Sequence, residues 1–416
     1  MIKLAFHGKP QKGSAGMLIV EMLSTGDEVL HGQIIDTNAA WLADCLFQQG
    51  LPLHSRTTVG DSLDSLVETF IERSHHANVV IVNGGLGPTS DDLSALAAAT
   101  AAGVPLVEHP EWIAVMESYF TARGREMPAT NRKQALLPVN AELIDNPVGT
   151  ACGFAMHLND CWFFFTPGVP SEFKVMVNEQ IIPRLRQKLT LPEPPICLRL
   201  TSFGRSESSL ARQFDPLELP KECVLGYRSS MPIIELKLTG PANQRDAMEQ
   251  VWQVVKAGVG DNKVFEGTEG IGALVRESLE QQQLSVVTHE QFSAGLLYWT
   301  LNAAKAPVTQ GNIEKSATHA DLAALVQTAK NNRSLNQREI GLVIGEYYDG
   351  TLSLALSTPT GSYAQCVNYL PRNHSELEKQ QVSVMLMLDM LSRWLDGRPI
   401  IGDYEWLEQI QVMEVN

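Results

Sequence analysis

The chain has 416 residues, of which 44% are hydrophobic and 19% are charged, and these fractions indicate a folded globular protein of two or three domains. Its 32 basic and 47 acidic residues give a formal charge of −15, which argues against binding of nucleic acid or of anionic membrane surfaces, since both require basic patches. The six cysteines form no CxxC pair, and no apolar run approaches the roughly 20 residues that span a bilayer, so we expect a cytoplasmic protein without a disulfide framework or a zinc knuckle.

Residues 1–16 differ in composition from the rest of the chain. They contain three lysines and no acidic residue, and they end in a Gly/Ser/Ala-rich stretch. Their apolar run is too short for the core of a signal peptide. We therefore expect a disordered leader, or the remnant of an upstream start, before a first domain that begins at Met17.

From Met17 onward, short apolar runs alternate with stretches of helical spacing, which is the pattern of an α/β domain with a parallel sheet. In chain order we predict a strand at 18–23, a helix at 36–50, a strand at 53–59, a helix with Asp61 as its N-cap, a strand at 78–83 and an Ala-rich helix that ends near Ala102. The β-branched strand 78–83 is polar only at its two ends, which predicts a sheet covered on both faces.

The remaining elements suggest two further modules. The first domain continues with predicted helices at 110–123, 130–137 and 171–188 and a strand pair within 154–165. The proline-rich residues 191–195 indicate a linker, 196–260 indicates a small α+β module, and 265–272 is a glycine-bracketed joint. Beyond it we predict a second α/β domain with helices at 271–282, 290–304, 319–332 and 375–395 and strands at 284–288, 340–345 and 351–357.

The glycine-rich turn after the strand at 78–83 carries the clearest functional signal. It supplies three glycines, two hydroxyls and two adjacent carboxylates: Gly84, Gly85, Gly87, Thr89, Ser90, Asp91 and Asp92. Glycines allow backbone N–H groups to approach an anion, and a pair of carboxylates suits a hard divalent cation that in turn binds phosphate. The alternative is that one aspartate only caps the following helix while the glycines form a tight turn.

Four other polar turns accompany this one. They are Thr25–Glu28, Val59–Asp61, Asn146–Ala151 and Thr166–Glu172. The first two follow predicted strands, and the carboxyl ends of parallel strands meet at one edge of a sheet, where ligands bind. We therefore expect the five turns to converge on a pocket for an extended phosphorylated ligand.

These motifs resemble the N-terminal domain of the CinA family, which is itself similar to the molybdopterin-binding MogA and MoaB proteins. The matching segments are TGDExxxGxxxDTN at 25–38, GGLGPTSDD at 84–92, NPVGTA at 146–151 and PGVPSE at 167–172. Residues 201–211 resemble the FGxxES element of the family's middle module, and the match is closest to the enterobacterial branch of the family. After the leader at 1–16, which is expected from its composition, the resemblance implies a MogA/MoaB-like domain at 17–190, a small α+β module at 191–264 and a degenerate α/β domain at 265–416.

The resemblance also implies a metal-dependent ADP-ribose pyrophosphatase, which cleaves the diphosphate to AMP and ribose 5-phosphate. Cobalt, manganese or magnesium is the expected cofactor, because a cation neutralises the diphosphate and lets water attack phosphorus. We expect the metal at Asp92, with Asp27, Asp61 or Asp91 in support. The catalytic candidates are Asp61, Asp91 and Asp92, and which of them activates water stays open.

The expected contacts of this nucleotide-type substrate come from all five turns and from one helical stretch. They are Thr25, Gly26, Glu28, Asn38, Gly84, Gly85, Gly87, Thr89, Ser90, Lys133, Gln134, Asn146, Gly149, Thr150, Pro167 and Gly168. The alternative function is a non-catalytic protein that binds a nucleotide or a molybdopterin without turnover.

The C-terminal domain departs from the family pattern. Many CinA proteins end in a nicotinamide mononucleotide deamidase domain with the signature A-E-S-C-T-G-G, whose serine is the nucleophile. Gln291 stands at that position here, and an amide cannot form an acyl-enzyme. Ser293 is a weak substitute, and Lys315 is the only candidate partner in a segment that lacks the family's tyrosine. We expect an inactive domain that binds a nucleotide weakly or forms an interface in a homo-oligomer.

Overall fold

The computed structural model describes residues 18–191, 193–315, 321–333, 339–369 and 374–415. The predicted leader lies outside these residues, as do parts of the predicted linker and of the helix expected at 319–332. The chain forms two compact units that divide after Pro195. None of the helices in the described ranges is long and apolar enough to cross a membrane.

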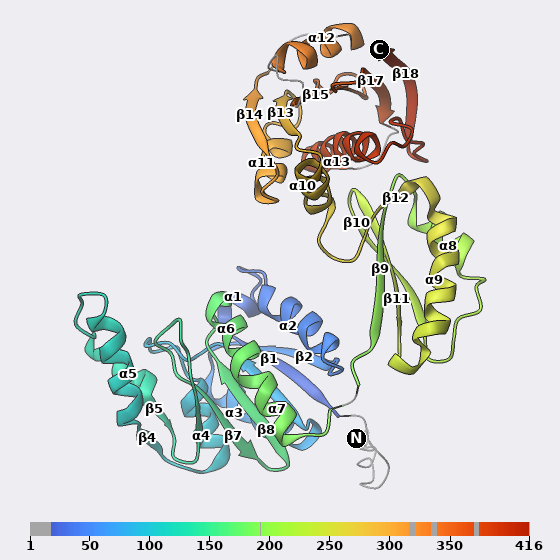
Figure 1. Ribbon diagram of the computed structural model, residues 1–416. Coiled ribbons are helices and arrows are strands. Elements are labelled where there is room, and N and C mark those ends of the chain that lie inside the picture. Colours follow the sequence, from blue (N-terminus) through green and yellow to red (C-terminus); the bar gives the residue numbers. More distant parts are fainter. Residues whose placement is uncertain (1–17, 192, 316–320, 334–338, 370–373, 416) are drawn as a thin grey trace, which may run out of the picture. The chain divides into compact units, whose positions relative to one another are not determined.

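The first unit is built on a six-stranded sheet with the order β2-β1-β3-β8-β7-β6 (Figure 1). The first four strands in this order are parallel, and β7 and β6 are antiparallel. The strands are β1 (Val20–Thr25), β2 (Leu53–Val59), β3 (Val79–Asn83), β6 (Glu142–Ile144), β7 (Gly153–Leu158) and β8 (Cys161–Thr166). A separate two-stranded sheet pairs β4 (Leu106–Glu108) with β5 (Leu136–Pro138).

The helices of this unit connect the strands and cover the sheet (Figure 1). They are α1 (Asp27–Leu30), α2 (Thr37–Gln48), α3 (Leu63–His76), α4 (Ser94–Ala102), α5 (Pro110–Thr121), α6 (Pro170–Met176) and α7 (Ile182–Lys188). A 3-10 helix spans Ala129–Ala135, and a π turn at Val177–Ile181 joins α6 to α7.

Alternate residues of β3 enter two different hydrophobic cores. Val80 and Val82 pack with residues of α3, α4 and α5, whereas Val79 and Ile81 pack with residues of α2, α6 and α7. All five residues of β3 are buried, since successive side chains of a strand point to opposite faces and both faces are covered by helices. The prediction that this sheet is covered on both sides is confirmed.

Two local predictions in this unit are wrong. Ser62, not Asp61, is the N-cap of α3, and its hydroxyl accepts the Ser65 N–H at 3.5 Å. Asp61 cannot fill that role because its carboxylate binds the backbone of Asp27 instead. The helix expected at 130–137 is a 3-10 helix that ends at Ala135, because the next residues join β5.

The second unit contains two sheets. The smaller is antiparallel, with the order β10-β11-β9-β12, and its core lies against α8 and α9. Its elements are β9 (Ile196–Phe203), α8 (Glu207–Phe214), β10 (Val224–Ser230), β11 (Ile233–Gly240), α9 (Arg245–Val259) and β12 (Lys263–Glu266). Short 3-10 turns at Ala242–Gln244 and Gly260–Asn262 flank α9.

The larger sheet has six strands in the order β14-β13-β15-β16-β17-β18. The first three are parallel and the last three are antiparallel. The strands are β13 (Ser285–Glu290), β14 (Val308–Ile313), β15 (Glu339–Ile344), β16 (Thr351–Ser357), β17 (Ser362–Tyr369) and β18 (Leu407–Val415). The helices are α10 (Ile271–Gln281), α11 (Leu296–Ala303), α12 (Leu322–Asn332) and α13 (Glu376–Leu395).

The larger sheet differs from its prediction in two respects. Strands β14, β17 and β18 were not predicted, and α11 begins at Leu296 rather than at Glu290 because Glu290 is the last residue of β13. Since both sheets belong to one compact unit, the predicted division between a middle and a C-terminal domain stays a prediction.

Candidate functional site

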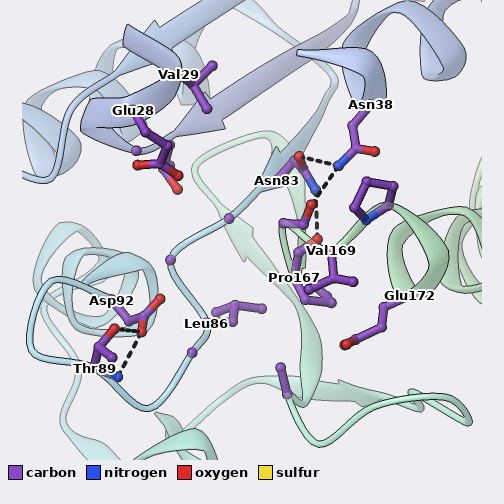
Figure 2. A pocket seen from close by; sticks show the side chains of 18 of the residues that line it. Glu28, Val29, Asn38, Asn83, Leu86, Thr89, Asp92, Pro167, Val169 and Glu172 are labelled. Carbon is purple, nitrogen blue, oxygen red and sulfur yellow. Dashed lines mark hydrogen bonds between the residues drawn. The ribbon is translucent and has the colours of Figure 1, made fainter. Parts of the chain in front are cut away.

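A cavity of about 510 Å³ lies at the carboxyl edge of the first sheet (Figure 2). Its wall is formed mainly by the residues that follow β1, β2, β3 and β8, because parallel strands end at the same edge. The sequence-predicted residues in this wall are Thr25, Gly26, Glu28, Asn38, Asp61, Gly84, Gly85, Gly87, Thr89, Asp91, Asp92, Gln134, Thr150, Pro167 and Gly168. The structure therefore brings residues from all five predicted turns together.

The glycine-rich turn lines this cavity with Gly84, Gly85, Leu86 and Gly87. Ser94 fixes two carbonyl groups of this turn. Its hydroxyl donates to Gly84 O at 2.8 Å, and its N–H donates to Gly85 O at 3.1 Å. The N–H groups of Gly85, Leu86 and Gly87 donate to no other described residue. Gly84 has a φ of 113°, and a Cβ there would lie 2.6 Å from Thr25 Oγ1. A glycine is therefore required where the turn passes Thr25.

Asp92 holds the far end of the same turn. Its Oδ2 accepts the Thr89 N–H at 2.8 Å and also the Thr89 hydroxyl (Figure 2). Helix α4 begins two residues later, at Ser94, and its N-cap Leu93 makes no side-chain bond. Neither Asp91 nor Asp92 caps this helix, so the simple capping alternative does not explain them. Asp91 is exposed, and a hydrogen bond from the Thr89 hydroxyl is the main reason that its pKa is lowered.

Asp27 and Asp61 lie side by side after β1 and β2. The Asp27 N–H donates to Asp61 Oδ2 at 3.1 Å, and the Asp61 N–H donates to Asp27 Oδ1 at 3.2 Å. Burial raises the pKa of Asp61, and the charges of Asp27, Glu28 and Asp91 raise it further against the hydrogen bond from Asp27. No lysine, arginine or histidine is among the described residues of the wall. The charges of Asp27 and Glu28 therefore act on Asp61 without a cationic side chain among the wall residues, whereas the Lys133 ammonium, which lies outside the wall, acts on Asp91.

The carboxylates of the cavity do not form a metal site enclosed by protein side chains within the described residues. No group of three His, Cys, Asp or Glu side chains in the described ranges could hold a metal ion. Asp27 and Asp61 are adjacent, whereas Asp92 is bound to Thr89. Magnesium-like cations commonly use one or two carboxylates and complete their shell with water and substrate phosphates. The residues thus fit a cation shared with a ligand rather than one enclosed by protein.

Asn83 is a wall residue that the sequence analysis did not name. The Asn38 side-chain amide donates to Asn83 Oδ1 at 3.0 Å and to Gly168 O at 2.8 Å, and the Asn83 amide donates to Pro167 O at 2.7 Å (Figure 2). These bonds fix the turn after β8 to the ends of β3 and α2. The sequence signal that could have identified Asn83 is that it is a polar residue at the carboxyl end of a buried strand.

Five predicted residues lie outside the wall: Asp27, Ser90, Lys133, Asn146 and Gly149. The Lys133 ammonium donates to the carbonyl oxygen of Thr89, so it supports the glycine-rich turn. The Asn146 amide donates to Glu172 Oε2 at 2.7 Å, and Glu172 is itself in the wall. Exposed apolar side chains, which the sequence analysis did not assign to the site, complete the wall at Ile34, Ile35 and Val169.

The degenerate deamidase positions do not form a nucleophilic site. Ser293 is 2% exposed, and its hydroxyl donates to Glu290 Oε2 at 2.7 Å. Gln291 Nε2 donates to Glu314 Oε1 at 3.3 Å. Lys315 is exposed. The Glu290 carboxylate also accepts the N–H groups of Gly295, Leu297 and Tyr298, so it keeps Ser293 engaged at the start of α11.

Comparisons with known proteins show what this chain is similar to. A family described as probable molybdopterin binding domain matches residues 21–187, which include the first sheet and its cavity. A CinA-like protein of Escherichia coli strain 55989 is 54% identical over 400 residues, which cover 96% of this chain and 100% of that protein. The same identity and coverage apply to a protein of Escherichia coli K12 named NMN amidohydrolase-like protein YfaY.

Solved structures resemble part of the chain. The structure of the protein CinA, of unknown function, from Thermoplasma acidophilum covers 41% of this chain and 96% of its own, with 26% identity and a TM-score of 0.37. The molybdopterin biosynthesis enzyme MoaB of Thermus thermophilus covers 41% of this chain and 94% of its own, with 16% identity and a TM-score of 0.29.

Proposed function

The chain belongs to the CinA family, and from this premise we infer that its N-terminal domain is a metal-dependent hydrolase. Its substrate is ADP-ribose or a similar nucleoside-diphosphate sugar, and its products are AMP and ribose 5-phosphate. The C-terminal domain has no deamidase activity in this proposal. The proposal combines the family membership with the chemistry of the cavity at the carboxyl edge of the first sheet.

The observation that carries the proposal is the charge of the cavity. Burial raises the pKa of Asp61, the charges of Asp27, Glu28 and Asp91 raise it further, and no basic side chain is among the described wall residues. An anionic diphosphate would be repelled from such a wall unless a cation accompanied it. In contrast to these carboxylates, the unpaired N–H groups of Gly85 and Leu86 favour a negatively charged ligand. Both features are met by a diphosphate with a divalent cation.

The roles of this chain's own residues follow from that arrangement. Asp61 and Asp27 would hold the cation, which when bound neutralises the diphosphate and activates water. The glycine-rich turn would bind phosphate oxygens, and the apolar residues Ile35 and Val169 would contact the base or the sugar. In the hydrolysis, a water oxygen forms a bond to one phosphorus, the bridging P–O bond breaks, and a carboxylate accepts the proton of the water. Asp61, Asp91 and Asp92 are the candidates for this last role.

The test is an assay of the full chain with ADP-ribose in the presence of cobalt, manganese or magnesium. We expect AMP and ribose 5-phosphate to appear in equal amounts, to be abolished by a chelator, and to fall at least about a hundredfold in Asp92→Ala. Asp64→Asn, an exposed carboxylate on α3, is the matched control. Absence of metal-dependent AMP release from the unmodified chain would exclude the hydrolase.

The second candidate is a protein that binds a nucleotide or a molybdopterin without turnover. The matched family, described as a probable molybdopterin binding domain, favours this alternative. It predicts tight binding of ADP-ribose or of a pterin by calorimetry, with no product after long incubation. The two functions are therefore separated by measuring binding and product release on the same sample.

A further inference from the structure

Glu172 is a wall residue of the first cavity to which the proposed hydrolysis gives no role. It belongs to α6, directly after the turn that follows β8. Figure 2 shows its side chain apart from those of Glu28 and Asp92. The charges that raise the pKa of Asp61 come from other carboxylates, and Glu172 is not among them. Glu172 is therefore a separate carboxylate of the cavity, away from those proposed to hold the cation.

A buried amide fixes the Glu172 carboxylate in place. Asn146 is 2% exposed, and its Nδ2 donates to Glu172 Oε2 at 2.7 Å and to Ala151 O at 3.0 Å. Its Oδ1 accepts the Gly149 N–H at 3.1 Å, so the backbone sets the orientation of the amide. The carboxylate also lies so close to Gly149 that a Cβ there would clash with it. These contacts hold Glu172 in one position before any ligand binds.

The other carboxylate oxygen is available to a ligand. Glu172 Oε1 accepts no hydrogen bond from the described residues. It is not enclosed by protein either, because Glu172 is half-buried and this oxygen keeps accessible surface. Since each carboxylate oxygen has two lone pairs, Oε2 can accept a second hydrogen bond beside that from Asn146. The group can therefore accept two O–H donors from one ligand.

The surroundings of Glu172 favour hydroxyl donors over a cation or a phosphate. A divalent cation would need further oxygen ligands, but Asn146 directs its N–H toward Glu172 and its oxygen toward the backbone. A phosphate would meet a negative charge in a wall whose described residues include no lysine, arginine or histidine. The hydroxyls of a ribose suit such a group, since an acidic side chain binds the ribose hydroxyl in dinucleotide-binding folds as well.

We propose that Glu172 recognises the ribose attached to the base of the ligand, by accepting hydrogen bonds from its 2′- and 3′-hydroxyls. This inference rests on the proposed function, because it concerns the nucleotide-type ligand of the same cavity. Val169, an exposed apolar wall residue, is the N-cap of α6, so a base in contact with Val169 lies next to a ribose at Glu172. The diphosphate then extends toward the glycine-rich turn. Glu172 is thus a residue that selects ribonucleotides over deoxyribonucleotides.

The test is calorimetric titration of the full chain with ADP and with 2′-deoxy-ADP in the presence of magnesium. We expect the unmodified chain to bind ADP at least about tenfold more tightly, because 2′-deoxy-ADP cannot make one hydrogen bond to a charged acceptor. In Glu172→Gln this preference should fall to within about threefold, since an amide has one uncharged acceptor oxygen. The variant should keep its melting temperature, because that oxygen can still accept the Asn146 N–H.

Glu179→Gln is the matched control. Glu179 is an exposed residue of the π turn after α6 and lies outside the cavity wall, so its substitution removes the same charge without touching the ligand. It should keep the full preference for ADP. A loss of preference as large as that in Glu172→Gln would show that net charge, and not a contact with ribose, is responsible, and would overturn the proposal.

Titration with IDP, which lacks the amino group of adenine, separates the ribose from the base. The proposal is overturned if Glu172→Gln abolishes a preference for ADP over IDP and leaves that over 2′-deoxy-ADP intact. It is also overturned if the unmodified chain binds ADP and 2′-deoxy-ADP equally, or binds neither at millimolar concentration. AMP release from ADP-ribose is measured on the same sample. Hydrolysis without a preference for ADP excludes the ribose contact alone, whereas the preference without hydrolysis excludes the hydrolase alone.

Discussion

Asp27 and Asp61, which are 34 residues apart in the chain, each accept the backbone N–H of the other through a carboxylate oxygen. This reciprocal pair fastens the turn after β1 to the turn after β2 and places two carboxylates next to each other. Backbone hydrogen bonds hold both side chains in fixed positions, so they can repel each other or share a cation without rearranging. This pair is the main structural support for the proposed cation at the edge of the first sheet.

The first prediction concerns metal binding at this pair. Manganese or magnesium at millimolar concentration should raise the melting temperature of the unmodified chain, because a cation that binds only the folded state stabilises it by mass action. The rise should be largely lost in Asp61→Asn and retained in Asp64→Asn, and thermal unfolding with and without a chelator measures it. An equal rise in Asp61→Asn would place the cation elsewhere.

The second prediction concerns the backbone of the glycine-rich turn. Gly84→Ala should lower the free energy of unfolding by about 1–3 kcal/mol, because its φ of 113° disfavours a side chain and the new Cβ would meet Thr25. It should also abolish binding of ADP-ribose by displacing the N–H groups of the turn. Gly103→Ala is the control, since Gly103 also has a positive φ of 66° but open space around it. It should cost about 1–2 kcal/mol and leave binding intact; denaturant titration and calorimetry distinguish the two.

The third prediction concerns the pH dependence of stability at Glu405. Its carboxylate accepts the Arg205 Nε–H at 2.6 Å, the Ser209 hydroxyl at 2.7 Å and the Ser206 N–H at 3.0 Å. Burial acts to raise the pKa of Glu405, but these hydrogen bonds outweigh it and the pKa is lowered from the ordinary 4.5.

An acid whose pKa is lower in the folded state stabilises the protein above its ordinary pKa, and this contribution is lost as the pH falls through the lowered value. Glu405→Gln should therefore lower the melting temperature at pH 7, and the difference should shrink below pH 4.5. Glu414→Gln, on the exposed strand β18, should show no such trend. A difference that is constant with pH would contradict the assignment.

The fourth prediction concerns a buried ion pair. The Arg393 Nε–H donates to Asp389 Oδ2 at 2.7 Å, and the side chains are 1% and 3% exposed. Asp389→Ala should destabilise the fold by about 3–5 kcal/mol, because it leaves a buried guanidinium without its counter-charge. The double variant Asp389→Leu with Arg393→Met should lose less than the single one. Denaturant titrations of the unmodified chain, Asp389→Leu, Arg393→Met and the double variant give the coupling, and additive losses would contradict it.

The fifth prediction concerns the proposed absence of deamidase activity around Ser293. The chain should release no ammonia from nicotinamide mononucleotide, and Ser293→Ala should leave that result unchanged. The variant should instead lose about 1.5–3 kcal/mol of stability, because the buried Glu290 carboxylate loses the hydroxyl of Ser293. Ammonia release by the unmodified chain that Ser293→Ala abolishes would show that the domain is a deamidase after all.

Local sequence patterns predicted the bounds of elements in which one hydrophobic pattern continues from the first residue to the last. Strand β2 (Leu53–Val59) and strand β16 (Thr351–Ser357) have the predicted bounds. Strand β18 was missed because exposed residues interrupt its apolar ones, and its pairing with β17 is what makes it a strand. Helix α11 starts late because Glu290 ends a strand and accepts N–H groups from the turn that follows, which periodicity does not reveal.

The sequence by itself determined which turns hold the polar residues of the site. Glycines, hydroxyls and carboxylates reach the edge of the sheet only if they directly follow a strand, and their position after a strand can be recognised in the sequence. Composition also set the net charge of −15, to which the carboxylates of the first cavity contribute. Only the tertiary structure decided that Asp61 binds Asp27 rather than capping α3, that Asp92 binds Thr89, and that Asn83 belongs to the site. The reason is physical: helical spacing and strand alternation act over a few residues, whereas hydrogen bonds between residues 34 positions apart depend on which strands become neighbours in the sheet.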